Sequence, residues 1–239
     1  MDDGTSSISP LDFYARLGSE LAPTVIDVRR DPPIQRAVGW VVSAFYSAPE
    51  EVKHWSNVTL SQPVVVYCSE GDDVSQNVAR ALRAAGIETF YLQGGIAGWI
   101  DKGLPTRRVG TTAVGRWVTR ERPKVDRIAC PWLIKRFIDP RSEFLYVPAE
   151  QVLEVARATG ATPYDIKGVE FGHHGDRCSF DATVSTYDIK DPALDHLALI
   201  VRGADTSHRD LAPNARVCWR FHTVCPPALR MTTRNSSTA

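Results

Sequence analysis

The stretch "VVVYCSEGDDVSQNVARALRAAG", residues 64–86, decides the fold of the N-terminal half. A β-branched run ends at Cys68, a short polar loop follows, and apolar residues then recur at helical spacing up to Gly86. This pattern predicts a strand, a loop and a helix with a left-handed C-terminal cap. Loop amides and the helix N-terminus would favour a reactive thiolate at Cys68. The alternative is a buried structural cysteine, but the polarity of the loop argues against it.

The segments around this stretch predict a parallel sheet. A short amphipathic helix at 9–23 precedes a β-branched strand at 24–30, and another strand at 87–95 follows the helix. A strand, a helix and a strand in this order form a right-handed βαβ unit, so the two strands run parallel. We therefore expect an α/β fold with an N-terminal parallel sheet flanked by helices.

A second block of elements begins near residue 116. Apolar patterning and capping residues predict strands and helices at 116–120, 124–139, 143–148, 149–160 and 192–205. Pro131 falls inside the second of these segments, so we expect it near a helix start or at a kink. The block predicts a second, smaller domain that is α/β or mainly helical.

Two changes in composition divide the chain. The stretch "TRRVGTTAVG" at 106–115 is small and polar, which is typical of a linker. From residue 211 the sequence loses its apolar period and contains a proline pair. We therefore expect one domain at 1–109, a second domain at 110–210, and an irregular, poorly ordered tail at 211–239.

The overall composition is that of a soluble globular protein, with 43% hydrophobic and 23% charged residues. The 28 basic residues equal the 28 acidic ones, so the net charge does not favour nucleic acid or a membrane as partner. No apolar run approaches the roughly 20 residues that span a bilayer, and the N-terminus lacks a signal-peptide pattern, so we expect a cytoplasmic protein. The five cysteines show no CxxC spacing, which argues against a disulfide framework.

The N-terminal motifs carry a family resemblance. "VIDVRR" at 25–30, the Cys68 loop and "YLQGGIAGW" at 91–99 together resemble a rhodanese domain, a sulfurtransferase fold. The resemblance implies that Cys68 attacks a sulfane sulfur and carries it as a persulfide, with Asp27 and Arg29 as further catalytic residues and a small-molecule sulfur donor as partner. It also implies that a loop surrounds the bound sulfur, made of Ser69, Glu70, Gly71, Asp72, Asp73 and Val74.

The charge of this loop departs from the family pattern. Three carboxylates occupy it, and no basic residue follows before Arg80. Neighbouring negative charge disfavours a thiolate and repels a dianion such as thiosulfate. A helix N-terminus contributes only about half a positive charge, which does not offset about three negative ones. We therefore expect weak or absent activity on thiosulfate, whereas a cationic or thiol-borne donor stays open.

Two motifs of the second block suggest binding sites. The segment at 118–136 is rich in arginine and lysine, and Arg120 and Arg127 are candidates for binding an oxyanion. The alternative there is a solvated helix face. "GVEFGHHGDRCSFD" at 168–181 offers Glu170, His173 and Cys178 as ligands for a zinc-like or iron-like ion. The alternative is a glycine-rich turn in which His173 caps the next helix.

The second block also resembles a known family. "WVTRERPKVDRIACPWLIKRFIDP" at 117–140 and "EFGHHGDRCSFD" at 170–181 are similar to the C-terminal domain of chromate-resistance proteins of the ChrB type. Arg202 stands where such proteins are expected to have a histidine, which weakens a metal site at that position. The resemblance implies a part in chromate resistance. The alternative is a non-catalytic sensor or regulatory module that binds an oxyanion or a metal through this domain.

Overall fold

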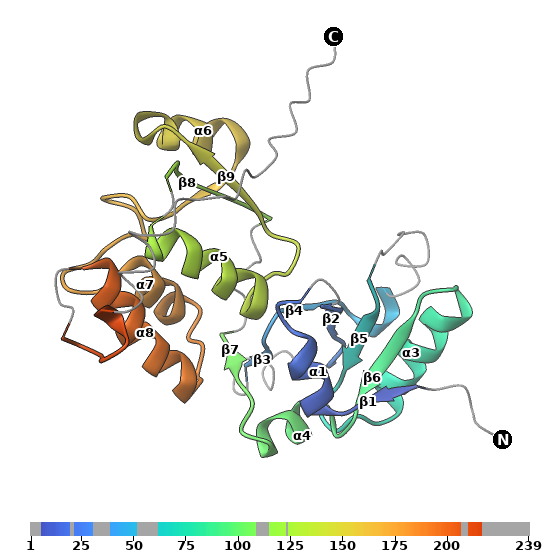
Figure 1. The fold of residues 1–239 in the computed structure, drawn as a ribbon. Coiled ribbons are helices and arrows are strands. Elements are labelled where there is room, and N and C mark those ends of the chain that lie inside the picture. Colours follow the sequence, from blue (N-terminus) through green and yellow to red (C-terminus); the bar gives the residue numbers. More distant parts are fainter. Residues whose placement is uncertain are drawn as a thin grey trace, which may run out of the picture.

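The computed structural model describes residues 6–19, 22–30, 39–51, 62–108, 115–122, 124–206 and 210–216. Within these ranges the chain forms two α/β units that follow each other along the sequence (Figure 1). The expectation of a poorly ordered tail concerns residues that lie mostly outside the described ranges, as do Cys218 and Cys225.

The N-terminal unit is built on the predicted parallel sheet, which is confirmed. The strand order is β1-β6-β5-β2-β4, and every neighbouring pair is parallel. The strands are β1 (Ser7–Ile8), β2 (Thr24–Asp27), β4 (Ala44–Tyr46), β5 (Val64–Tyr67) and β6 (Thr89–Leu92). The edge strands β1 and β4 are only two and three residues long, so no alternating pattern announces them in the sequence.

Helices cover both faces of this sheet. Side chains alternate along β5, so Val64 and Val66 pack with helix α3 (Asp73–Ala84), whereas Val65 and Tyr67 belong to the core on the opposite face. That second core also receives helices α1 (Pro10–Arg16) and α4 (Gly95–Asp101) (Figure 1). Burial on both faces explains the unbroken apolar run of β5.

The second unit combines a small parallel sheet with a group of helices. The sheet has the order β10-β8-β9, with β8 (Arg116–Arg120), β9 (Glu143–Val147) and β10 (Thr162–Pro163). The helical elements are α5 (Val125–Phe137), η2 (Ala149–Gln151), α6 (Val152–Thr159), α7 (Ser179–Thr186) and α8 (Pro192–Asp205). Helices α5, α7 and α8 pack on one another, and α6 packs on β8 and β10.

Pro131 lies in the interior of α5 rather than near its start. A proline has no N–H, so it leaves the carbonyl oxygen four residues earlier, that of Arg127, without its helical donor. The hydroxyl of Tyr146 on β9 lies 3.5 Å from this oxygen. The neighbouring strand therefore supplies a polar contact where the helix cannot, which is a tertiary compensation that the sequence pattern does not show.

The two units share one apolar core. A single cluster of buried residues includes Phe13 and Trp99 from the first unit and Leu133 and Phe137 from the second. The C-terminal end of α5 contacts the first unit directly, because Ser43 N–H donates to the carbonyl of Phe137 at 2.8 Å.

Polar contacts reinforce this junction. The guanidinium of Arg136 donates to the Leu17 carbonyl and lies 5.0 Å from the ring centroid of Tyr14. Strand β7 (Thr106–Arg107) pairs antiparallel with β3 (Trp40–Val41), and the Thr106 carbonyl accepts the Lys190 N–H of the second unit. Both backbone and side chains thus hold the two units together.

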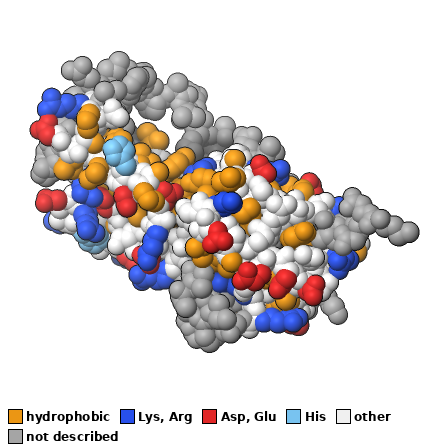
Figure 2. Space-filling view, turned by 90° about the horizontal axis from the view of Figure 1, so that it is seen from below, with side chains coloured by type: hydrophobic (Ala, Val, Ile, Leu, Met, Phe, Trp, Pro, Cys, Tyr) orange, Lys and Arg blue, Asp and Glu red, His pale blue; other side chains and the backbone are white. Residues whose placement is uncertain are grey.

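The described surface carries mixed charge. On the face in Figure 2, basic and acidic side chains are interspersed, in keeping with the equal numbers of both in the sequence. None of the helices in the described ranges is both long enough and apolar enough to cross a membrane.

The loop after β5 requires glycine where it approaches α4. A Cβ atom on Gly95 would lie 2.5 Å from the Cys68 carbonyl oxygen and 2.6 Å from the Gly71 nitrogen. We predict that Gly95→Ala lowers the free energy of unfolding by roughly 1–3 kcal/mol more than Gly86→Ala does. Gly86 is the matched control because its φ is also positive, at +84°, yet nothing lies within 4 Å of the point that a Cβ atom would occupy there.

Urea denaturation of both variants and the parent protein measures this difference. Equal destabilisation by the two substitutions would mean that backbone strain alone matters and that the close approach of the β5–α3 loop to the start of α4 does not.

Candidate functional site

Cys68 follows the last residue of β5 and precedes α3, as the sequence predicted. Its side chain is 3% exposed and packs in the aliphatic cluster that includes Val66, Val78 and Leu82. Parallel strands end together at one edge of a sheet, and α/β proteins commonly bind ligands at this edge. Cys68 therefore lies at the edge of the sheet where the sequence placed it, although the residue is almost fully enclosed, and its role as a nucleophile stays a prediction.

The sulfur atom has two polar neighbours. Cys68 Sγ donates to Asp72 Oδ1 at 3.0 Å and lies 3.2 Å from Ser75 Oγ. Asp72 is the N-cap residue of α3, yet its side chain makes no capping hydrogen bond. An aspartate at this position usually accepts from helix amides, so its turn toward the thiol is a specific feature of this loop.

The loop backbone is fixed by α4. Amide groups of Ile96 and Ala97 donate to the carbonyl oxygens of Cys68 and Ser69, each at 3.0 Å. Gly71 adopts a φ of +76°, and a Cβ there would lie 2.7 Å from the Leu92 carbonyl oxygen. The first amides of α4 therefore hold the loop itself.

The remaining loop residues differ in exposure. Glu70, Asp72 and Asp73 are exposed, whereas Ser69 and Val74 are half-buried. The three carboxylates are thus exposed around a thiol that donates a hydrogen bond to one of them. That the amides from 69 to 74 surround a bound sulfur stays a prediction.

Asp27 and Arg29, predicted as catalytic, form a buried ion pair. Arg29 Nη2 lies 2.5 Å from Asp27 Oδ2, and the Arg29 backbone N–H also donates to Asp27 Oδ1 at 3.0 Å. A second donor bond from Arg29 Nη2 reaches the Gly39 carbonyl at 2.7 Å. These contacts give the pair a role in shaping the end of β2, and its catalytic role stays a prediction.

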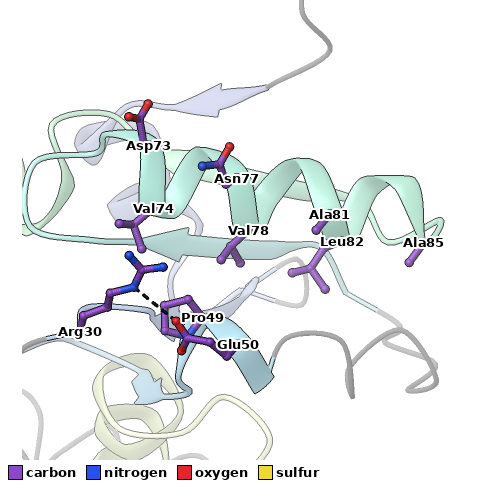
Figure 3. A pocket seen from close by; sticks show the side chains of 10 residues that line it. All are labelled: Arg30, Pro49, Glu50, Asp73, Val74, Asn77, Val78, Ala81, Leu82 and Ala85. Carbon is purple, nitrogen blue, oxygen red and sulfur yellow. Dashed lines mark ion pairs between the residues drawn. The ribbon is translucent and has the colours of Figure 1, made fainter.

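A pocket of about 410 Å³ lies beside α3 (Figure 3). Helix residues such as Val78 and Leu82 form one wall, and Pro49 and Glu50 form the other, with Glu50 paired to Arg30 at 3.4 Å. Cys68 does not line this pocket. Asp73 and Val74, which were predicted to bind the substrate, do line it, so the pocket adjoins the loop that follows Cys68.

The second unit contains a compact charged centre, which we call the carboxylate–histidine cluster: Asp126, Asp165, His173 and Asp205. Each residue contributes one ligand-type atom, and these four atoms all lie within 4.8 Å of one another. They come from the start of α5, the segment after β10, the loop before α7 and the end of α8. Four separate segments thus converge on one point.

Burial and charge determine the protonation of this cluster. The Asp126 side chain is fully buried, whereas that of His173 is 39% exposed. Hydrogen bonding to Asp126, and then to Asp165 and Asp205, raises the pKa of His173 to about 11. Burial acts to raise the pKa of Asp205, but the interaction with His173 lowers it overall.

The predicted oxyanion residues Arg120 and Arg127 adjoin this cluster. Arg127 Nε lies 3.0 Å and Arg120 Nη2 lies 3.3 Å from Asp165 Oδ2. Arg127 is only 4% exposed, and burial lowers its pKa below the ordinary value. The structure thus brings both arginines together, on a carboxylate of the protein, and their binding of an external anion stays a prediction.

The predicted metal ligands are only partly brought together. His173 belongs to the cluster, whereas Glu170 and Cys178 do not. Glu170 is exposed, and its carbonyl oxygen lies 2.8 Å from His174 Nε2. Cys178 packs inward as the N-cap residue of α7, where burial and then the charge of Asp126 raise the pKa of its thiol. Metal binding by the predicted set stays a prediction.

Arg202, which replaces an expected histidine, lies outside the cluster. It pairs with Asp181 at 2.5 Å, and Asp181 also accepts the Cys178 N–H at 2.9 Å. This residue therefore supports the start of α7.

Sequence analysis missed the three aspartates of the cluster. One signal was present for Asp126, because it shares a helix face with the buried residues Cys130, Leu133 and Phe137 at helical spacing. A carboxylate on the apolar stripe of a helix needs a partner in the interior. Asp165 and Asp205 carry no comparable signal, since their neighbours in sequence do not reveal that they meet.

Comparisons with known proteins agree with the two-part architecture. Residues 9–102 match the family model of the rhodanese-like domain, and residues 117–226 match that of the ChrB C-terminal domain. The Protein ChrB of Cupriavidus metallidurans is 35% identical over 119 residues, which cover 49% of this chain. The matched part spans 34% of the length of that relative.

Solved structures of rhodanese-type proteins resemble the N-terminal unit. A rhodanese-related protein from Thermoplasma volcanium is 26% identical, with a TM-score of 0.36, and the match covers 41% of this chain and 94% of that one. A rhodanese-like domain protein from Staphylococcus aureus is 20% identical, with a TM-score of 0.35 and coverages of 40% and 91%. The chain thus joins a rhodanese-like domain to a C-terminal domain of the ChrB type.

Proposed function

We propose that this protein acts in chromate resistance and that its rhodanese-like domain carries sulfur as a persulfide on Cys68. The observation that carries the proposal is the polar contact of Cys68 Sγ with Asp72 and Ser75 at the end of β5. A purely structural cysteine in an aliphatic core has no need of a carboxylate acceptor within 3.0 Å.

The reaction is an exchange between a thiol and a low-mass persulfide. Cys68 sulfur attacks the outer sulfur of R–S–SH, the S–S bond of the donor breaks, and the products are Cys68–S–SH and R–SH. The Cys68 thiol gives up its proton as the new S–S bond forms, and the leaving thiolate takes up a proton to give R–SH. Ser75 Oγ, 3.2 Å from the sulfur, can stabilise the negative charge that develops there.

The charge of the loop selects against anionic donors. Glu70, Asp72 and Asp73 are exposed at the entrance, so they repel a dianion such as thiosulfate. The donor amides at the start of α4 are already bonded to carbonyl oxygens of the loop. A neutral or cationic persulfide is therefore the favoured donor.

The alternative function is a non-catalytic sensor or regulatory module. The low exposure of Cys68 favours it, because a donor must reach the sulfur of a residue that is only 3% exposed. In this alternative the rhodanese fold is a scaffold, and the C-terminal domain binds the ligand. Sulfur loading of Cys68 distinguishes the two functions.

We predict that the reduced full-length protein gains one sulfur atom on Cys68 when it is incubated with cysteine persulfide, and much less with thiosulfate. Peptide mass spectrometry after digestion measures this gain. The peptides with Cys130 and Cys178 are internal controls, since both residues lie outside the rhodanese-like unit and are 0% exposed, against 3% for Cys68. Unmodified Cys68 in a folded protein would contradict the proposal and favour the non-catalytic module.

We predict that Asp72→Asn speeds alkylation of Cys68 by iodoacetamide. Asparagine keeps the shape and an acceptor oxygen but removes the charge 3.0 Å from the sulfur. Without this charge the sulfur loses an electrostatic barrier to the negative charge that it carries during attack, so we expect a rise of roughly threefold. Glu154→Gln on α6 is the matched control, because this exposed carboxylate lies on the second unit. An unchanged or slower rate in Asp72→Asn would show that the loop charge does not restrain the thiol.

A further inference from the structure

We propose that the carboxylate–histidine cluster is a binding site for a divalent first-row transition-metal ion, with Asp126, Asp165, His173 and Asp205 as its ligands. The site lies in the C-terminal domain. It does not depend on sulfur transfer at Cys68, so either proposal can fail alone.

The separations between His173 and the three carboxylates are close to those of a metal coordination sphere. His173 Nε2 lies 3.3 Å from Asp126 Oδ2, 3.4 Å from Asp165 Oδ1 and 3.3 Å from Asp205 Oδ2. In a tetrahedral site with bonds of about 2.0–2.1 Å, neighbouring ligand atoms are about 3.3–3.4 Å apart. One ion can therefore contact the imidazole nitrogen and an oxygen of each carboxylate after small side-chain adjustments.

Hydrogen bonding alone accounts poorly for this arrangement. A protonated His173 has one Nε2–H group, which can point at only one of the three carboxylates. All three separations exceed the roughly 2.7–2.9 Å of a charge-assisted hydrogen bond between nitrogen and oxygen. A ring nitrogen at nearly equal distances from three oxygens is instead typical of ligands around a shared cation.

The second oxygen of Asp165 is held by outer partners. Asp165 Oδ2 faces Arg127 Nε at 3.0 Å and Arg120 Nη2 at 3.3 Å, whereas Oδ1 faces His173 and also accepts from Ser179 Oγ at 3.4 Å. Outer partners that orient a ligating carboxylate in this way are typical of protein metal sites. The two arginines therefore have a role as supports of the site.

The other two carboxylates are oriented by backbone amides. Asp205 Oδ1 accepts the N–H of Asp126 at 3.4 Å, which leaves Oδ2 for the centre. Asp126 accepts the amides of Ser179 at 2.6 Å and Phe180 at 3.4 Å, at the N-terminus of α7. Each carboxylate is thus fixed before any ion arrives, which lowers the cost of ordering the site.

The donor set indicates the class of metal. Three carboxylate oxygens and one imidazole nitrogen suit Mn²⁺, Fe²⁺ and Zn²⁺, and among these ions Zn²⁺ generally binds most tightly. Cys178 is buried at the start of α7 and is not among the residues whose ligand-type atoms converge, so the ligand set proposed here contains no sulfur. The partial exposure of His173 gives an ion a path from solvent.

The test is metal binding by the full-length protein after removal of bound metals with EDTA. We expect one equivalent of Zn²⁺ or Mn²⁺ to bind in isothermal titration calorimetry and to raise the midpoint of thermal unfolding. His173→Ala and Asp205→Asn should each weaken binding by more than about 100-fold, because loss of an outer partner alone costs about 10–100-fold. His174→Ala and Asp176→Asn are matched controls, exposed and outside the cluster, and should bind as the parent does.

Three results would overturn the proposal. The parent protein could bind neither ion in a one-to-one ratio, or both cluster variants could bind normally. The third is that Cys178→Ser abolishes binding while Asp205→Asn retains it, which would return the site to the ligand set that the sequence alone suggests. Circular dichroism checks folding, and if His173→Ala does not fold, the Asp205→Asn result decides.

Discussion

Helix α5 is anchored at both ends, and this constraint organises the molecule. Its last turn bonds to the first unit through Arg136 and Phe137, and its first turn supplies Asp126 and Arg127 to the charged centre. A helix rises 1.5 Å per residue, so Asp126 and Arg136 are about 15 Å apart along a stiff rod. Helix α5 therefore fixes the position of the charged centre relative to the N-terminal sheet, together with the contact of Lys190 with Thr106.

The protein places carboxylates in two contrasting environments. Around Cys68 they are exposed, and Asp72 among them contacts the sulfur. In the second unit Asp126 and Asp165 are buried and receive amides, guanidinium groups and an imidazole. Buried charge is costly unless it is compensated, so the second group must be an organised site, whereas the first mainly sets a local potential.

The elements with a clear period could be predicted from the sequence, and the short ones could not. The apolar run of β5 and the apolar face of α3 are visible in the sequence. Strands β1, β3 and β7 are only two residues long and can be assigned only from their pairing with other strands. The position of Pro131 inside α5 could not be predicted for a similar reason. The carbonyl that the proline leaves without a helical donor is contacted by Tyr146, which lies on strand β9. Local patterns predict local structure, and tertiary contacts decide the exceptions.

The same limit applies to the sites. Cys68 could be placed because strand, loop and helix are contiguous in sequence, but the turn of Asp72 toward its sulfur could not. Of the charged centre only His173 could be identified, since Asp126, Asp165 and Asp205 lie far apart in the chain and meet only after folding. Cys178 was an attractive ligand by residue type, yet its place at the start of α7 directs it inward.

The shared core also bears on any dissection of this chain. Phe13 and Trp99 belong to the same buried cluster as Leu133 and Phe137, so neither half encloses its own hydrocarbon surface. Cleavage of the chain between residues 109 and 114 would expose this apolar surface on both fragments. Such fragments would tend to aggregate or to recombine, and the natural unit of this protein is the undivided pair.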